Sequence, residues 1–409
     1  MWARCVRCTQ AHPGWTLAAA WVFTRVLLVA QLAAFPDAFL GDVHLYAVWS
    51  GVLVQGQFPA PDPFWQYPPG AGVLFAALGL LGPAPVPAFI GLALVADAAI
   101  LVMACRAVTR CEGAPTSWWA PTAWVIGGLA IGPVLLARFD LFPTALAVAA
   151  ILALGRPRIS GALAGLGALL KAWPLLLLLA VPRRRIPGAL AAAISVIVIG
   201  ALAIAAWAPG SLDFLDQQRD RGLQVESVGA LVYVAAGAIG ADPQIVLRFG
   251  AFEIQGVGVE QIGTTLTLVG LALLAGLALL RLFGRLESVP GGDVALLAVL
   301  ISVATSRVLS PQYAVWLIGI GIAAACDPRS ASRRATRLLI AMAAVTQVLF
   351  PWGYGSYLDT AAYAVCLQVF RIALLIWATA AIGKAIVQAA RRGVGSESSS
   401  PSTRQRNQA

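Results

Sequence analysis

The chain has 409 residues, of which 60% are hydrophobic and only 11% are charged, and its mean hydropathy is +0.83. A soluble domain carries about 25% charged residues, so this composition excludes a water-soluble fold. The net charge of +10 does not indicate a nucleic-acid partner, because the basic residues fall in short clusters between apolar segments.

Apolar segments that are long enough to cross a bilayer recur along the whole chain. Segments such as 188–207 and 264–280 lack the period-two alternation of a membrane barrel, so the spans must be helices. We therefore predict an all-α polytopic membrane protein with about 12 transmembrane helices, within a range of roughly 10 to 13. The predicted spans are 15–35, 86–105, 118–136, 141–154, 160–170, 173–181, 189–208, 263–280, 294–305, 313–325, 338–350 and 361–382.

The basic clusters between the spans predict the topology. With Arg4 and Arg7 in the cytoplasm, 20 of the 28 basic residues lie on the cytoplasmic side and 12 of the 18 acidic residues lie outside. This is the positive-inside pattern, and it predicts a multi-pass plasma-membrane protein with both termini in the cytoplasm. The clusters are Arg106/Arg110, Arg156/Arg158, Arg183–Arg185, Arg281/Arg285, Arg329–Arg337 and Lys384–Arg392.

The domain organisation is simple. Residues 1–392 are predicted to form one transmembrane domain with two large outer loops, 36–85 and 209–262. Residues 393–409 are rich in Ser, Gln and Arg and predict a disordered cytoplasmic tail. The six cysteines lie in termini, spans or cytoplasmic turns, which argues against a disulfide framework. Cys5 and Cys8 lack a second pair that would complete a zinc site, so we expect no metal.

Three segments fit the count of spans badly. Residues 67–82 are apolar but short, and they predict a juxtamembrane or re-entrant helix. Residues 160–181 are flanked by arginines at both ends, so they form either one span or a short hairpin with LLKAWPLL at its apex. Residues 228–262 are semi-polar and Gly-rich. Irregular backbone is tolerated at membrane depth only inside protein or beside a cavity, so these segments predict an outward-facing cavity.

The first outer loop contains the first candidate for chemistry, Asp42. Asp42 lies four residues before Tyr46, which places both side chains on one face of a short helix. The many prolines that follow predict an ordered loop, where a carboxylate is well placed to act as a general base. The alternative interpretation is that Asp42 only caps a helix that starts at Val43.

Two further candidate positions lie near the outer ends of spans. In the segment ARFDLFP, either Arg138 and Asp140 pair and cap the next helix, or they contact substrate. Lys171 lies within an apolar segment, where a charge costs about 2.5–3.5 kcal/mol on insertion scales. It therefore requires an anionic partner such as a phosphate, or a water-filled cavity, unless it reaches the membrane interface.

Two polar segments complete the set of candidates. Residues 211–227 offer hydrogen-bonding groups for sugar hydroxyls, although an ordinary solvated loop has the same composition. Its candidate residues are Arg219, Arg221, Gln224 and Glu226. The second segment is SRVLSPQY, residues 306–313, in which Arg307 is a candidate phosphate ligand. Gln312 and Tyr313 are further substrate-binding candidates, and Ser310–Pro311 predicts the start of a helix. Arg25 and Asp97 lie inside spans, where they either pair structurally or contact substrate.

Five segments of the chain together resemble the bacterial glycosyltransferase-87 family. They are the first outer loop, RFDLFP, GALAGLGALLKAWPLLLL, RGLQVES and LSPQYAVWL. This family includes α-mannosyltransferases that depend on polyprenol-phosphate mannose, and it belongs to the multi-pass GT-C glycosyltransferases. The resemblance extends from about Asp42 to Tyr313. It implies a GT-C-like bundle with short helices on the outer side.

The resemblance also implies a mechanism. A hexose, mannose in the family, passes with inversion from a polyprenyl phosphate to a lipid-linked or polysaccharide acceptor on the outer side. Asp42 corresponds to the family's general base, and Lys171 and Arg307 would stabilise the leaving phosphate. Asp140 and the 219–226 segment would orient hydroxyl groups, with Tyr46 and Tyr67 as further contacts. No cofactor or metal is implied.

Two other functional classes fit the composition. A transporter or flippase of a lipid-linked sugar needs the same charged cavity without catalysis, and a structural subunit of an envelope-synthesis complex needs neither. The sequence contains no phosphate-binding Gly-rich loop and no dinucleotide fingerprint, and it lacks an obvious inverted repeat. Asp42 distinguishes the three classes, because only the enzyme requires its carboxylate.

Overall fold

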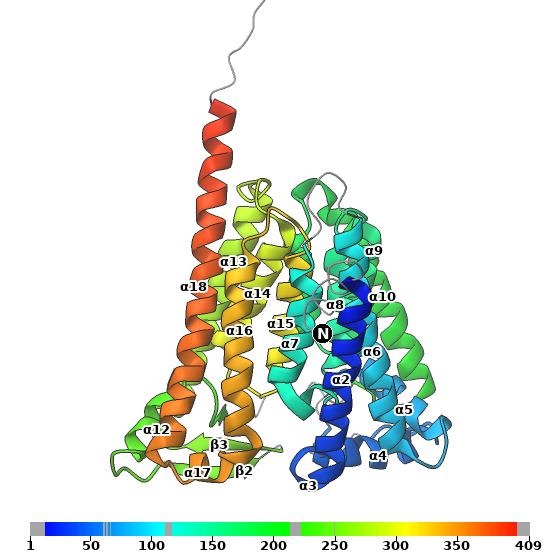
Figure 1. Ribbon diagram of the computed structural model, residues 1–409, viewed down its shortest axis with the longest axis vertical. Helices are drawn as coiled ribbons and strands as arrows, with labels where there is room; N and C mark the ends of the chain where they lie inside the picture. The colour runs from blue at the N-terminus through cyan, green and yellow to red at the C-terminus, as the bar shows by residue number, and fades with distance from the viewer. Residues whose placement is uncertain are drawn as a thin grey trace, which may run out of the picture.

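The computed structural model describes residues 13–59, 62, 64, 65, 67–110, 117–212, 222–248 and 250–398. This part of the chain is almost entirely helical, with a small sheet at one end of the bundle (Figure 1). Six helices are long and apolar enough to cross a bilayer. They are α2 (Pro13–Ala34), α6 (Pro85–Thr109), α10 (Ile186–Trp207), α13 (Val259–Leu282), α16 (Ser332–Gln347) with its extension η4 (Val348–Trp352), and α18 (Ala362–Ser398).

Shorter apolar helices fill all but one of the remaining predicted spans, and the exception, 173–181, is described below. They are α7 (Trp119–Ile131) with η1 (Gly132–Leu135), α8 (Leu141–Leu152), α9 (Pro157–Leu170), α14 (Gly291–Ala304) and α15 (Tyr313–Ala324). Helices of 12 to 14 residues are about 18–21 Å long, which is less than the hydrocarbon thickness. Nearly every residue of α14 and α15 is buried, so these two helices form the centre of the bundle. The helical membrane fold is confirmed, while the count of twelve crossings stays a prediction.

The segment 160–181 is a hairpin rather than one span. Helix α9 ends where Lys171 adopts extended backbone angles, and the chain returns as the 3-10 helix η2 (Trp173–Ala180). The arginine clusters at the two ends of the segment meet, because Arg185 Nη1 donates to Gly155 O at 3.1 Å. Lys171 therefore lies at the turn of the hairpin, as one of the two sequence interpretations predicted.

The glycines of α9 allow this hairpin to pack closely on α10. A Cβ added at Gly161 or Gly165 would overlap the α10 backbone at Ala189 and Ala193, respectively. Small residues four positions apart are the usual means by which membrane helices bring their backbones together. The GALAGLGALL segment thus fixes the position from which Lys171 projects.

The second outer loop contains strands that the all-α prediction missed. Strands β1 (Leu223–Gln224), β2 (Gln244–Arg248) and β3 (Ala251–Gln255) form an antiparallel sheet in the order β1-β3-β2. Ile254 pairs with Leu223 on one side and with Ile245 on the other, and its buried side chain packs with Val234 and Tyr357. The last two residues come from α12 (Leu231–Gly237) and α17 (Tyr354–Leu358). We call these strands and the two helices the outer lobe, after the side of the membrane predicted for this loop.

The first outer loop folds into three short helices at the same end of the molecule (Figure 1). They are α3 (Pro36–Phe39), α4 (Gly41–Leu53) and α5 (Pro69–Leu80), and α5 is the short helix predicted within residues 67–82. The ring of Phe35, just before α3, packs edge-on against Trp352, with 5.0 Å between ring centroids. The first loop therefore contacts η4, which leads directly into α17 of the outer lobe.

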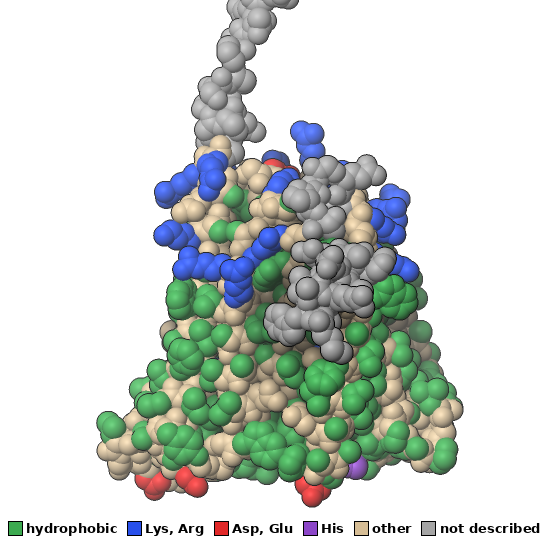
Figure 2. Space-filling model, in the orientation of Figure 1, with side chains coloured by type: hydrophobic (Ala, Val, Ile, Leu, Met, Phe, Trp, Pro, Cys, Tyr) green, Lys and Arg blue, Asp and Glu red, His purple; other side chains and the backbone are tan. Residues whose placement is uncertain are grey.

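Charge is distributed unequally between the two ends of the bundle. On the face in Figure 2, Lys and Arg side chains gather at the end reached by the C-terminal part of α18. Asp and Glu side chains lie mostly at the opposite end, with α3, α4 and the outer lobe, and apolar side chains cover the middle. The two ends therefore differ in charge as the positive-inside rule requires of a membrane protein, while the side of the membrane that each end faces stays a prediction. Helix α18 extends to Ser398, beyond the boundary predicted at Arg392 for the tail.

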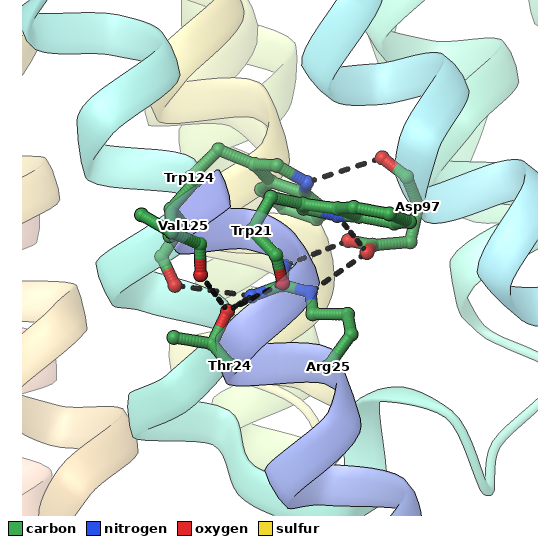
Figure 3. Close-up of polar contacts among 7 residues, drawn as sticks. Trp21, Thr24, Arg25, Asp97, Trp124 and Val125 are labelled. Carbon is green, nitrogen blue, oxygen red and sulfur yellow. Dashed lines mark hydrogen bonds and ion pairs between the residues drawn. The ribbon is translucent and has the colours of Figure 1, made fainter. Parts of the chain in front are cut away.

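A buried ion pair joins α2 to α6 and α7 (Figure 3). Arg25 Nε and Nη2 each donate to a carboxylate oxygen of Asp97 at 2.8 Å, and Arg25 Nη1 donates to Val125 O at 3.1 Å. Trp21 Nε1 also donates to Asp97, at 2.5 Å. Arg25 and Asp97 are 2% and 0% exposed, so nearly all of their hydrogen-bonding capacity is satisfied inside the protein. The predicted structural pairing of these residues is confirmed.

We expect Asp97→Ala to lower the free energy of unfolding by about 3–5 kcal/mol, because it leaves the Arg25 guanidinium buried without its counter-charge. Thermal unfolding in detergent measures this loss. The double variant Arg25→Met/Asp97→Leu, which removes both charges, should unfold closer to the wild type. A single variant that unfolds like the wild-type protein would contradict a structural role for the pair.

Candidate active site

Asp42 lies in the first turn of α4 and does not cap it. The N-cap position is Leu40, and no side chain caps this helix, so the capping interpretation of Asp42 is wrong. Asp42 Oδ2 instead pairs with Arg138 Nε at 3.1 Å. Arg138 Nη1 also donates to Phe39 O at 2.9 Å, so the same guanidinium holds the corner between α3 and α4. Arg138 therefore fixes both the carboxylate of Asp42 and the backbone that carries it.

Asp140 is buried and bound to two donors from distant parts of the chain. Lys171 Nζ donates to Asp140 Oδ1 at 2.6 Å, and Trp316 Nε1 donates to the same oxygen at 2.7 Å. Asp140 is the N-cap residue of α8, but its side chain makes no capping bond. The predicted Arg138–Asp140 pair is therefore wrong, because these two residues project from their turn toward different partners. Lys171 thus has the anionic partner that an apolar segment requires, and this partner is a carboxylate of the protein itself.

Aromatic rings surround the Lys171 ammonium. Tyr313 and Trp316 stack with 3.9 Å between ring centroids, and Trp173 stacks with Trp316 at 5.1 Å. Lys171 Nζ lies 4.8 Å from the centroid of the Trp316 ring and 5.7 Å from that of Tyr313. The hairpin apex and the start of α15 thus bring the predicted residues Lys171, Asp140 and Tyr313 together. Rings near a cation add an attraction that is stronger where water is excluded.

Tyr46 and Tyr67 meet beside this group of charges. Their hydroxyl oxygens lie 3.2 Å apart, and both rings pack in an aromatic cluster with Trp49, Phe75 and Phe139. Burial, and then the neighbouring charge of Asp42, raise the pKa of Tyr67, and burial also raises the pKa of Tyr46. Both hydroxyls therefore stay protonated and serve as neutral hydrogen-bonding groups next to Asp42.

The residues predicted in the second outer loop hold the outer lobe to the bundle. Gln224 Oε1 accepts from Leu309 N at 2.8 Å. Glu226 is 1% exposed and pairs with Arg371 of α18. The prediction that Glu226 contacts sugar hydroxyls is therefore unsupported, because its buried carboxylate is engaged by an arginine that the sequence did not reveal. Arg219 and Arg221 lie outside the described residues.

Arg307 is engaged by an acid near the start of α13. Its Nη2 and Nη1 lie 2.5 and 2.7 Å from the two carboxylate oxygens of Glu260. The helix predicted to start at Ser310–Pro311 begins at Tyr313, with Gln312 at its N-cap position. Arg307 therefore differs from Lys171, because its bidentate partner is a largely exposed acid rather than a buried one.

Two acidic and two cationic side chains form a compact set: Asp42, Asp140, Arg138 and Lys171. We call them the charged quartet. They come from α4, the turn before α8 and the apex of the α9–η2 hairpin. The side chains of Asp42 and Lys171 are 40% and 23% exposed, whereas Asp140 and Arg138 are nearly buried. One acid and one cation of the quartet are thus accessible to a bound molecule, and the other two hold them in position.

The apolar spans and the charged side chains among them define a polytopic membrane protein with a polar site. This arrangement is expected of a membrane enzyme that acts on a lipid-linked substrate. The model of glycosyltransferase family 87 matches residues 65–311, and the chain belongs to this family. The chain is therefore a membrane glycosyltransferase. The matched segment includes Tyr67, Arg138, Asp140 and Lys171, whereas Asp42 precedes it. Neither the curated proteins nor the solved structures gave a match.

Proposed function

We propose that the chain transfers a hexose from a polyprenyl-phosphate donor to a glycolipid or polysaccharide acceptor, with Asp42 as the general base. The observation that supports this proposal best is the contrast between the two acids of the charged quartet. Asp140 is 2% exposed and holds two donors on one oxygen, whereas the Asp42 side chain is 40% exposed and is held by Arg138 through Oδ2. Asp42 therefore has an oxygen available for an acceptor hydroxyl.

In the proposed reaction, the acceptor oxygen attacks C1 of the donor sugar while Asp42 takes the proton of the hydroxyl. The bond between C1 and the phosphate oxygen breaks, and its electron pair leaves with the polyprenyl phosphate. A direct displacement of this kind inverts the anomeric configuration. Because negative charge develops on the phosphate, a fixed cation beside it stabilises the transition state.

We assign this role to Lys171. Its ammonium is partly exposed, it lies at the hairpin apex, and Trp316 still donates to Asp140 when the ammonium turns toward a phosphate. Arg307 is already bound by Glu260, so the proposal does not require it. Tyr46 and Tyr67 are then placed to orient hydroxyl groups next to Asp42.

We further propose that the site faces the outside of the plasma membrane and that the sugar is mannose. The location is supported by the acidic end of the bundle, where α4 carries Asp42, and by the basic residues at the opposite end (Figure 2). The choice of mannose rests on the resemblance to mannosyltransferases alone.

Purified protein in proteoliposomes tests the proposal. The donors are radiolabelled polyprenyl-phosphate mannose, glucose and galactose, and the acceptors are extracted cell-envelope glycolipids. We expect label to move from one donor to a glycolipid, with one polyprenyl phosphate formed per sugar transferred. Movement of intact donor across the bilayer without a new glycosidic bond would identify a flippase instead. Transfer that requires a nucleotide sugar would overturn the choice of donor.

A further inference from the structure

One buried donor close to Lys171 in the chain has no hydrogen-bond partner in the described part of the structure. Among the described residues, few buried side-chain nitrogen or oxygen atoms lack a hydrogen bond, and Trp173 Nε1 is one of them. Trp173 is 8% exposed and follows Lys171 by two residues. Buried polar groups in native proteins are nearly always satisfied, so an unpaired N–H beside a charged site requires an explanation.

The position of Trp173 is fixed by its stacking. It is the first residue of η2, and its ring stacks on Trp316 with 5.1 Å between centroids and 21° between planes. Trp316 stacks in turn on Tyr313 and donates its own N–H to Asp140. The stack therefore contains two indole donors. One is bound to the acid that holds Lys171, and the other is free.

We propose that Trp173 is a substrate-binding residue whose indole N–H donates to the phosphate of the polyprenyl carrier, beside Lys171. This inference rests on the proposed function and adds a residue to it. A phosphate carries negative charge and several oxygens, so it can accept from the Lys171 ammonium and from the neutral N–H of Trp173 at the same time. Hydrogen bonds to a charged acceptor are about twice as strong as neutral ones, so Trp173 contributes to carrier affinity.

The stack also explains why the donor is a tryptophan rather than a flexible polar residue. Its ring fills the space at the hairpin apex next to Trp316, while its single N–H provides a donor that cannot rotate away. The phosphate is then bound by the Lys171 ammonium and by one neutral donor that stacking holds in place. The carrier binds through both before transfer, and it is held as the leaving phosphate afterwards.

The experiment compares Trp173→Phe with Trp65→Phe. Trp65 Nε1 is also buried and unpaired, but its ring belongs to the cluster with Trp49 and Phe58, so this variant is a matched control. Binding of undecaprenyl phosphate to protein in nanodiscs is measured at equilibrium, together with the KM for the sugar donor and for the acceptor. We expect Trp173→Phe to raise the Kd and the donor KM about tenfold, with the acceptor KM unchanged. Trp65→Phe should change the Kd less than about twofold.

A second variant separates the loss of the N–H group from a loss of folding. Trp173→His keeps a ring N–H, so it should bind undecaprenyl phosphate more tightly than Trp173→Phe at a similar melting temperature. If Trp173→Phe folds and binds the phosphate like the wild type, the inference is wrong even though sugar transfer persists. If the wild-type protein neither binds undecaprenyl phosphate nor uses its sugar derivative, both the inference and the proposed function fail.

Discussion

Asp42→Asn is expected to reduce kcat for sugar transfer by about 10²–10⁴-fold while the donor KM stays nearly unchanged. Asparagine has almost the same shape and can still accept a hydrogen bond from Arg138, so the corner between α3 and α4 should keep its structure. The amide cannot take the proton of the acceptor hydroxyl. Initial rates of transfer in proteoliposomes measure the effect.

Asp37→Asn is the matched control for this variant. Asp37 is an exposed carboxylate on α3 in the same outer loop, and no ion pair involving it occurs among the described residues. Its replacement removes an equal charge and should leave kcat at the wild-type level. Equal losses in the two variants would indicate a general effect of charge at the membrane surface rather than base catalysis by Asp42.

Lys171→Gln should lower kcat/KM by about 10²–10³-fold, because it removes the cation proposed to stabilise the leaving phosphate. It should also lower the free energy of unfolding by up to about 3 kcal/mol, since Asp140 stays buried with Trp316 as its remaining donor. Transfer rates and melting temperatures of the same samples separate the two effects. Lys384→Gln, at an exposed lysine on α18, is the control.

The double variant Asp140→Asn/Lys171→Gln distinguishes chemistry from structure. It removes both members of the buried pair, so it should recover much of the melting temperature that Lys171→Gln loses. It should not recover transfer, because the phosphate still lacks its cation. Recovery of both properties would mean that Lys171 only stabilises the fold and that another group binds the phosphate.

The sequence was sufficient to predict the membrane fold, but not its shortest elements. Long apolar segments such as α10 and α13 are identified by hydropathy alone. The α9–η2 hairpin was one of two interpretations, because arginines flank both ends and a proline follows Lys171. The strands β2 and β3 were missed, since a semi-polar, Gly-rich segment in a membrane protein predicts a loop, although the two strands are neighbours in the chain and pair as a hairpin.

The residues of the candidate site were predicted from the sequence, but the pairs that they form were not. Asp42 was identified in the first outer loop, Arg138 and Asp140 at the outer end of a span, and Lys171 as a charge within an apolar segment. Their partners come from far along the chain, and Asp140 binds Trp316 at a separation of 176 residues. A tryptophan in an apolar helix is usually a core residue, so no sequence feature singled out Trp316 or Trp173. Arg371 was missed as well, although a single charge inside a long apolar span is the signal that identified Lys171 and Arg25.

A single-turnover measurement tests the central claim most directly. Protein loaded with labelled polyprenyl-phosphate sugar is mixed with excess acceptor glycolipid, and the products are quantified over time. We predict that the wild type transfers one sugar and forms one polyprenyl phosphate per bound donor, whereas Asp42→Asn retains its donor unreacted. Transfer by Asp42→Asn at the wild-type rate and amplitude would contradict the assignment of Asp42 as the base of a lipid-phosphate-dependent glycosyltransferase.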